Sequence, residues 1–207
     1  MIKAILFDRD GVLVDSNESI IFTYQMTGKV LGLKVPKKEF FRKSLGITYP
    51  TILKRAYGKD KKILETYNKM WYVGKNRIKP KKMSGFNNAM KKIKLKKAIV
   101  TSGSMHATKT MLKDSLKYFQ FVVTRADTKN HKPNAEPLLL ACKKLRIKPK
   151  EAVYVGDSVI DYKTARNAGM KFIGFLSNGS TKKEFEKTGV KVTVKSLNEL
   201  TKIIEKF

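Results

Sequence analysis

Short, nearly continuous apolar runs alternate with segments of helical periodicity over most of the chain. The runs lie at Ala4–Phe7, Ala98–Val100, Phe121–Val123, Val153–Val155 and Phe172–Phe175. Their length and lack of polar positions are typical of strands that are buried on both faces. Helical spacing occurs near 86–94, 104–115, 134–146 and 159–168, and a weak strand near 190–194 and a helix near 196–206 follow. This alternation predicts a parallel sheet with right-handed crossover connections.

Residues 16–83 interrupt the alternation, because only helical patterns occur there. Asp15 and Glu18 have capping-box spacing, so we expect Asp15 to be the N-cap of a helix that runs to about Leu31 and ends at Gly32. Further helices are predicted near 37–44, 50–57 and 60–74. In the last of these, Ile63, Leu64, Tyr67, Met70 and Trp71 recur at helical spacing, which favours a buried face.

The whole pattern predicts an α/β fold with a three-layer, Rossmann-like core around a parallel sheet and an all-helical insertion after the first strand. We expect residues 1–15 and 84–207 to form the core domain and residues 16–83 to form the helical insert. With 207 residues, the chain is long enough for one sizeable core and a small insert.

Composition narrows the class of protein. A content of 42% hydrophobic and 10% aromatic residues predicts a globular chain, and no apolar run is long enough for a membrane span. The N-terminal residues lead straight into the first strand, so we expect no cleavable signal peptide. Cys142 is the single cysteine, which excludes an internal disulfide and favours the cytoplasm as the location.

The charge is strongly positive, with 45 Lys and Arg against 17 Asp and Glu, a formal net charge of +28. Such a balance raises the hypothesis of a nucleic-acid partner. However, only seven of these residues are Arg, the residue that groove reading favours, and the lysines are spread along the whole chain. We therefore expect a solvated basic surface that attracts anionic substrates rather than a nucleic-acid-binding protein.

Acidic residues are scarce, and five of the eight aspartates lie in two short stretches, 8–15 and 157–161. Asp8-Arg9-Asp10-Gly11 directly follows the first strand, and Asp157 and Asp161 follow the strand at 153–155. The carboxyl ends of parallel strands meet at one edge of a sheet, where ligands bind. Neighbouring carboxylates repel one another, so the arrangement favours a hard divalent cation such as Mg²⁺. Taken singly, Asp-x-Asp-Gly is also compatible with a turn, and one of the later pair with a helix cap.

Two further stretches are candidates for anion binding. Thr101, Ser102 and Gly103 follow the strand at 98–100 and precede a helix, whose N-terminal N–H groups attract anions. A generic loop explains this stretch equally well. Lys132-Pro133 lies between the strand at 121–123 and the next helix.

These motifs, in this order, resemble the haloacid-dehalogenase-like superfamily, in particular its phosphoglycolate phosphatase and beta-phosphoglucomutase group with a helical cap. The residues that carry the match in the first motif are Asp8, Asp10, Gly11 and Val12. Many members have a hydrophobic residue where this chain has Arg9. We expect the Arg9 side chain to point away from the site, as alternation in an extended segment implies.

The resemblance implies a Mg²⁺-dependent phosphatase that hydrolyses small phosphomonoesters through an aspartyl-phosphate. Asp8 would be the nucleophile and Asp10 the general acid and base. Asp8, the backbone carbonyl of Asp10 and Asp157 would hold the metal, with Asp161 acting through water. Phosphoglycolate is the substrate that the resemblance implies, and a monomer is the default state.

The resemblance also implies phosphoryl contacts from Thr101, Ser102, Gly103 and Lys132, and contacts from the insert to the leaving group, for which Arg42 and Tyr49 are the candidates. A phosphomutase would use the same residues and is the alternative within the fold. A nucleic-acid-associated binding protein, or a phosphatase of nucleic-acid ends, is the alternative from another class.

Overall fold

A computed structural model describes residues 1–177 and 179–204. Six parallel strands form the central sheet in the order β5-β4-β1-β6-β7-β8. Their bounds are β1 Ala4–Phe7, β4 Lys96–Val100, β5 Val122–Val123, β6 Ala152–Gly156, β7 Lys171–Phe175 and β8 Thr193–Val194. All of them correspond to predicted strands, and β1 lies between β4 and β6 with Phe7 opposite Ile99 and Val155.

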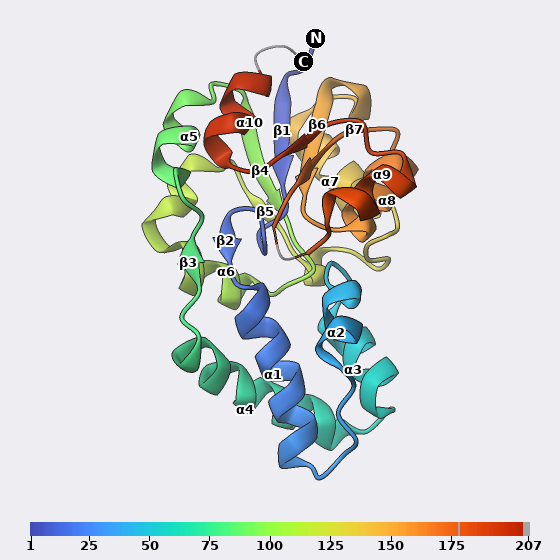
Figure 1. The fold of residues 1–207 in the computed structure, drawn as a ribbon. Coiled ribbons are helices and arrows are strands. Elements are labelled where there is room, and N and C mark those ends of the chain that lie inside the picture. Colours follow the sequence, from blue (N-terminus) through green and yellow to red (C-terminus); the bar gives the residue numbers. More distant parts are fainter. Residues whose placement is uncertain (178, 205–207) are drawn as a thin grey trace.

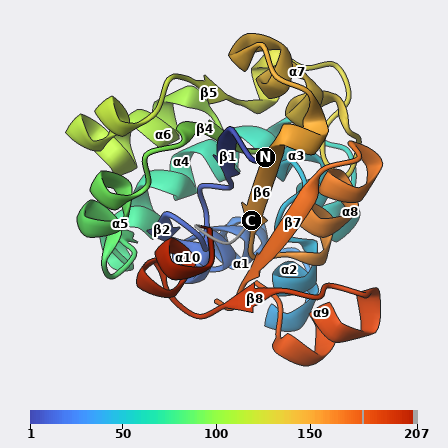
Figure 2. The ribbon, with the colours of Figure 1, turned by 90° about the horizontal axis from the view of Figure 1, so that it is seen from above.

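Helices cover both faces of the sheet (Figures 1 and 2). One face packs on α5 Phe86–Lys92, α6 Met105–Leu112 and α10 Leu197–Ile204, and the other on α7 Glu136–Leu145 and α8 Val159–Asn167. The strands are apolar on both sides because alternate residues of β1 serve different cores: Ile5 and Phe7 join the first, Ala4 and Leu6 the second. The predicted three-layer α/β core is therefore confirmed.

Four helices form a separate layer below the carboxyl edge of the sheet (Figure 1). They are α1 Asn17–Val30, α2 Lys38–Ser44, α3 Tyr49–Tyr57 and α4 Lys61–Arg77, and we call this layer the cap. Its core is aromatic: the ring of Tyr24 stacks on Phe41 at 5.4 Å and on Tyr67 at 5.1 Å, and Phe41 is fully buried. The cap thus has a core of its own.

A short antiparallel pair, β2 Val14–Asp15 with β3 Lys81–Lys82, joins the two chain segments that connect the core with the cap. The predicted role of Asp15 as a helix cap is wrong. Its backbone is extended because it pairs with Lys81, and α1 starts two residues later with Ser16 as N-cap and no side-chain cap bond. Strand pairing with a distant segment overrides the local capping pattern.

The remaining elements differ from the sequence-based predictions in detail. Helix α9 Lys182–Thr188 was not predicted, although Thr181 and Glu184 form a complete capping box there. The predicted helix at 104–115 is α6 followed by the 3-10 helix η1 Lys113–Tyr118. Two further 3-10 helices are η2 Arg125–Asp127 and η3 Pro149–Glu151. The predicted end of the last helix at 206 lies outside the described residues.

Among the described residues, none of the helices combines the length and the apolar character that a membrane crossing requires.

Candidate active site

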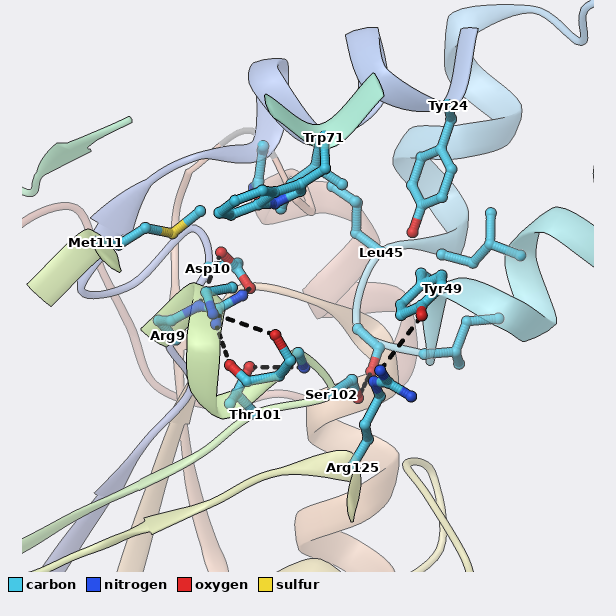
Figure 3. A pocket seen from close by; sticks show the side chains of 18 of the residues that line it. Arg9, Asp10, Tyr24, Leu45, Tyr49, Trp71, Thr101, Ser102, Met111 and Arg125 are labelled. Atoms are coloured by element: carbon cyan, nitrogen blue, oxygen red, sulfur yellow. Dashed lines mark hydrogen bonds and ion pairs between the residues drawn. The ribbon is translucent and has the colours of Figure 1, made fainter. Parts of the chain in front are cut away.

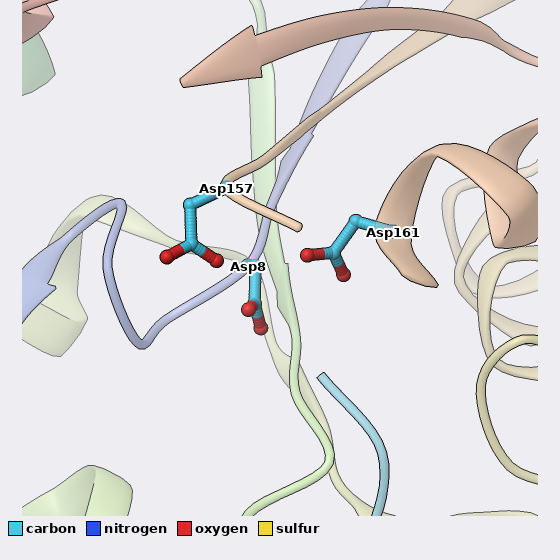
Figure 4. Close-up of side chains that lie close together, drawn as sticks. All are labelled: Asp8, Asp157 and Asp161. Atoms are coloured by element: carbon cyan, nitrogen blue, oxygen red, sulfur yellow. The ribbon is translucent and has the colours of Figure 1, made fainter. Parts of the chain in front are cut away.

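Three buried carboxylates meet at the carboxyl edge of the sheet (Figure 4). Asp8 follows β1, Asp157 follows β6 and Asp161 lies in the first turn of α8. One oxygen from each lies within 4.8 Å of the others, and the residues are only 4%, 2% and 0% exposed. The predicted convergence of Asp8 with Asp157 and Asp161 is what the structure has, and the three could hold a metal ion.

Lys132 provides the positive charge within this cluster. Its Nζ donates to Asp8 Oδ1 at 3.0 Å and to Asp161 Oδ1 at 2.8 Å, and it also bonds the hydroxyl of Tyr154. Although burial opposes the charge of the ammonium, the carboxylates of Asp161 and Asp8 raise the pKa of Lys132 above its usual value. The lysine therefore stays cationic, and it bridges the β1 end to α8.

One ammonium does not balance three carboxylates. Burial raises the pKa of Asp8 to about 7; Lys132 opposes this rise, whereas the charges of Asp161 and Asp10 add to it. Burial, together with the charges of Asp161 and Asp8, also raises the pKa of Asp157 well above its usual range. The cluster is thus short of positive charge in the protein alone.

Asp161 has all its acceptor capacity occupied by protein donors. Its Oδ2 accepts from the Ser158 hydroxyl at 2.6 Å and completes a capping box at the start of α8, as a helix-cap role predicts. Its Oδ1 accepts from Lys132 and from the Tyr154 hydroxyl at 2.9 Å. This saturation argues against direct contact between Asp161 and a metal.

Asp157 is held by donors on one oxygen only. Asn17 Nδ2 and Ser177 Oγ donate to its Oδ2 at 2.7 and 2.8 Å, while no described residue donates to Oδ1. A Cβ on Gly11 would lie 1.9 Å from Asp157 Oδ2, so the left-handed turn after Asp10 requires glycine here both for its φ of 73° and for space.

Arg9 does not point away from the site, so that prediction is wrong. Its guanidinium forms a two-pronged ion pair with Asp10, with Nη2 to Oδ2 at 2.6 Å and Nε to Oδ1 at 3.2 Å. Thr108 Oγ1 accepts from Nη1 at 2.7 Å, and the arginine is 3% exposed. The backbone explains the orientation, because the Arg9 carbonyl accepts from Leu13 and Val14 in a tight turn, where strand alternation no longer applies.

Ser16 fixes the other side of Asp10, since its hydroxyl donates to Asp10 Oδ1 at 2.5 Å. The Asp10 side chain therefore points into the space between core and cap rather than into the cluster of three carboxylates.

The loop after β4 lies beside these groups. Thr101 is 4% exposed, and its Oγ1 accepts from the Gly103 N–H at 3.1 Å. The Ser102 hydroxyl is committed to the cap, because it donates to the Gly46 carbonyl at 2.6 Å. A Cβ on Gly103 would meet the Arg9 guanidinium at 2.4 Å, so glycine is needed for the close approach of the two loops.

A cavity of about 250 Å³ lies between the core and the cap (Figure 3). Asp8, Asp10, Thr101, Ser102, Gly103 and Asp157 line it from the core, and Tyr24, Leu45, Tyr49, Tyr67 and Trp71 line it from the cap. Tyr49 lies where the sequence-based hypothesis placed it. Tyr67 and Trp71 belong to the helix face that was predicted to be core. Tyr67 is buried in the cap core as predicted, and both residues also form a wall of the cavity.

Arg42 is not among the residues that line this cavity. Its guanidinium is taken up by Glu184 of the core at 2.7 Å, by the Gly179 carbonyl at 2.6 Å and by Glu39 at 2.7 Å. Instead of facing a substrate, Arg42 ties α2 of the cap to the start of α9.

Sequence reasoning missed three side chains of the site. Asn17 was hidden within the predicted first helix, and Arg125 within a loop. His106 is exposed, and it also lines the cavity beside Trp71, with ring centroids 5.8 Å apart. Arg125 could have been proposed as a site residue on one ground: it is a cation that follows the predicted strand at 121–123, at the edge of the sheet where ligands bind.

Residues 5–175 match the model of the haloacid dehalogenase-like hydrolase family. The chain is 30% identical to pyrophosphatase PpaX of Bacillus cereus over 175 residues, which cover 82% of this chain and 81% of that protein. It is 28% identical to a phosphoglycolate phosphatase of Nitrosospira multiformis, and this match covers 99% of this chain and 96% of that protein. A hydrolase structure from Pseudomonas syringae superposes with a TM-score of 0.87 at 21% identity and 99% coverage of both chains, a likeness of fold.

The chain belongs to the haloacid dehalogenase-like hydrolase family. The relatives named above are a pyrophosphatase and a phosphoglycolate phosphatase.

Proposed function

We propose that this protein is a Mg²⁺-dependent phosphatase in which Asp8 is the nucleophile. The observation that carries the proposal is the buried cluster of Asp8, Asp157 and Asp161 around a single lysine. Attack of an Asp8 oxygen on phosphorus forms an aspartyl-phosphate and expels the leaving group, which divides one difficult displacement into two easier steps. Water then attacks the phosphorus of the aspartyl-phosphate, releasing phosphate and restoring the Asp8 carboxylate.

The donor set fits a hard divalent cation. Three carboxylates share one ammonium, and no described residue donates a hydrogen bond to Asp8 Oδ2 or Asp157 Oδ1. Asp8, Asp157 and the Asp10 carbonyl would hold Mg²⁺, with Asp161 acting through water. When bound, such an ion would neutralise negative charge that develops during phosphoryl transfer.

Asp10 is proposed as the proton carrier. It protonates the departing oxygen of the leaving group and later takes a proton from the attacking water. Arg9 and Ser16 fix both of its oxygens, at 2.6 and 2.5 Å, so its carboxyl plane is set before substrate arrives. Lys132 and Thr101, with the N–H group of Ser102, stabilise the charge on the transferring group.

The substrate is proposed to be a small phosphorylated metabolite. A cavity of about 250 Å³ beneath a cap is too small for a polymer and suits a compact leaving group. The names of the relatives, phosphoglycolate phosphatase and pyrophosphatase, describe substrates of this size.

We expect Mg²⁺-dependent phosphate release from a panel of phosphoglycolate, pyrophosphate and p-nitrophenyl phosphate, with a loss of at least about 100-fold when the metal is removed by EDTA. Re-addition of Mg²⁺ is the control for irreversible damage. Equal rates with and without metal contradict the proposal. Conversion of β-glucose 1-phosphate to the 6-phosphate without net phosphate release identifies the phosphomutase alternative instead.

Arg42 provides a test of cap closure. Arg42→Gln removes the ion pair with Glu184 and the bond to the Gly179 carbonyl, so the cap is held less firmly over the site. Because a partly exposed ion pair contributes up to about 1 kcal/mol, we expect KM to rise roughly two- to fivefold for every substrate alike. Steady-state kinetics measure this, and Lys43→Gln, which removes an exposed cap charge, is the control. A KM that stays at the wild-type value contradicts a role for the tie.

A further inference from the structure

Arg125 approaches the cavity from the core, on the 3-10 helix that follows β5 (Figure 3). Its guanidinium carbon lies 4.6 Å from the centre of the Tyr49 ring of the cap. Its Nη2 donates to the Tyr49 hydroxyl at 3.3 Å. The aromatic face supports the flat guanidinium without neutralising its charge.

The turn that carries Arg125 is well fixed. The N–H and the hydroxyl of Thr124 both donate to Asp127 Oδ2 at 2.7 Å, and Thr124 is 3% exposed. The Arg125 N–H donates to the Gly103 carbonyl at 3.3 Å, which attaches this turn to the loop of Thr101. The turn that carries the guanidinium is therefore fixed next to the loop that forms part of the proposed phosphoryl site.

Arg125 has unused binding capacity. A guanidinium has five N–H donors, and within the described part of the chain only the Tyr49 hydroxyl accepts from it. Its Nε is shielded from solvent and has no hydrogen-bond partner. Asp127, the acid on the same turn, is engaged by Thr124, and no described carboxylate forms an ion pair with Arg125.

The other arginine that lines the cavity differs in this respect. Arg9 is paired with Asp10 through two bonds. Arg125 is thus the cavity-lining arginine whose charge the described protein groups leave unmatched, and it lies among apolar and aromatic walls such as Leu45 and Trp71. A half-buried cation without a carboxylate partner in a substrate cavity is suited to an anionic group of the substrate.

We propose that Arg125 binds a second anionic group, carried by the leaving group, so that the enzyme selects phosphates whose leaving group bears a carboxylate or a further phosphate. The inference rests on the proposed phosphatase function. The forked N–H groups of arginine match the paired oxygens of either anion. The bond that breaks lies between this anchored leaving group and the phosphorus that Asp8 attacks, so Arg125 itself transfers no proton.

The test compares phosphoglycolate with hydroxyethyl phosphate, a matched ester with a hydroxyl in place of the carboxylate; pyrophosphate is the arm for a phosphate leaving group. For Arg125→Gln we expect KM to rise roughly 10- to 100-fold for the anionic substrate or substrates, the range for a lost charge-assisted hydrogen bond. For hydroxyethyl phosphate, KM is expected to stay within about threefold of the wild-type value. The change in kcat should be small, because this contact is made before and during the reaction. Arg125→Lys is expected to be intermediate.

Arg55→Gln is the matched control, because it removes the same charge from an exposed position of α3 outside the cavity. An equal rise in KM for all three substrates overturns the inference. It would mean that Arg125 acts by linking the core to the cap through Tyr49. A wild-type enzyme that does not prefer either anionic substrate overturns it as well.

Failure of the proposed function is distinguishable from failure of this inference. If the wild type releases no phosphate from any of the three with Mg²⁺, the phosphatase proposal fails. Calorimetric binding of the same compounds to the Asp8→Asn protein then tests Arg125 by itself. Tighter binding of phosphoglycolate or pyrophosphate than of hydroxyethyl phosphate, lost on Arg125→Gln, supports the anion site, and equal binding overturns it.

Discussion

Replacement of Asp8 by Asn is expected to lower phosphate release by roughly 10⁴-fold or more, the scale of loss when a nucleophile is removed. An amide oxygen does not displace the leaving group to form an acyl phosphate, so the first step has no nucleophile. The fold should persist, because Asn has the same shape and its oxygen still accepts from Lys132, which lies 3.0 Å from Asp8 Oδ1. Phosphate release measures the loss of activity, and circular dichroism measures whether the fold persists.

Asp15→Asn is the matched control for this variant. Asp15 belongs to the same chain segment and is exposed in β2, away from the three buried carboxylates. Its replacement should leave kcat unchanged. A well-folded Asp8→Asn protein that hydrolyses the panel at the wild-type rate would falsify the role of Asp8.

The sequence allows prediction of the core strands and of the groups that follow them, because both depend on local patterns. Buried parallel strands are short apolar runs, and a parallel sheet brings their carboxyl ends together whatever the intervening chain does. For this reason Asp8, Asp157 and Asp161 were predicted to share one place, whereas the role of Lys132 was implied only by the family resemblance. The structure gathers the three carboxylates, and Lys132 bonds two of them, Asp8 and Asp161.

The errors have a common physical origin in backbone that leaves its regular element. Arg9 lies two positions after the last residue of β1, where the chain turns so that the Arg9 carbonyl accepts from Leu13 and Val14. Asp15 is drawn into a strand by Lys81, a residue distant in sequence. Periodicity and capping rules describe single elements, so they fail where tertiary pairing decides the backbone.

The cavity walls were unpredictable for a different reason. Tyr67 and Trp71 have the spacing of a buried helix face, and a face that lines a cavity has the same spacing as one that packs against a core. Arg125 is one of many basic residues, and only its position over Tyr49 distinguishes it. The residues that line the cavity therefore depend on how the cap meets the core.

The second large effect concerns stability rather than turnover: the metal-free protein is expected to become less stable as the pH rises from about 5 to about 8. Burial raises the pKa of Asp8 to about 7, above its usual 3.8, so between these values the folded state holds a proton that the unfolded state has lost. Linkage then requires stability to fall as the pH rises through that window. The raised pKa of Asp157 acts in the same direction.

Glu39, Glu184 and Lys132 do not contribute to the change in stability between pH 5 and 8. Arg42 lowers the pKa of Glu39 and of Glu184 to about 2, so their contributions are lost only in more acidic solution. Lys132, whose pKa is raised from 10.5, keeps its charge throughout. From Asp8 alone we expect a loss of about 2 to 3 kcal/mol between pH 5 and 8, which corresponds to roughly 5 to 10 °C in Tm for a chain of this length.

Mg²⁺ is expected to reverse this dependence. The metal binds ionised carboxylates, so it competes with the protons that the cluster takes up at pH 5 and meets no such competition at pH 8. The increase in Tm on adding Mg²⁺ should therefore be several degrees larger at pH 8 than at pH 5, as thermal unfolding measures. Asp8→Asn should flatten the metal-free profile and reduce the effect of Mg²⁺, whereas Asp15→Asn should change neither. A metal-free Tm that does not vary between pH 5 and 8 would contradict the raised pKa values that follow from burial of the three carboxylates around Lys132.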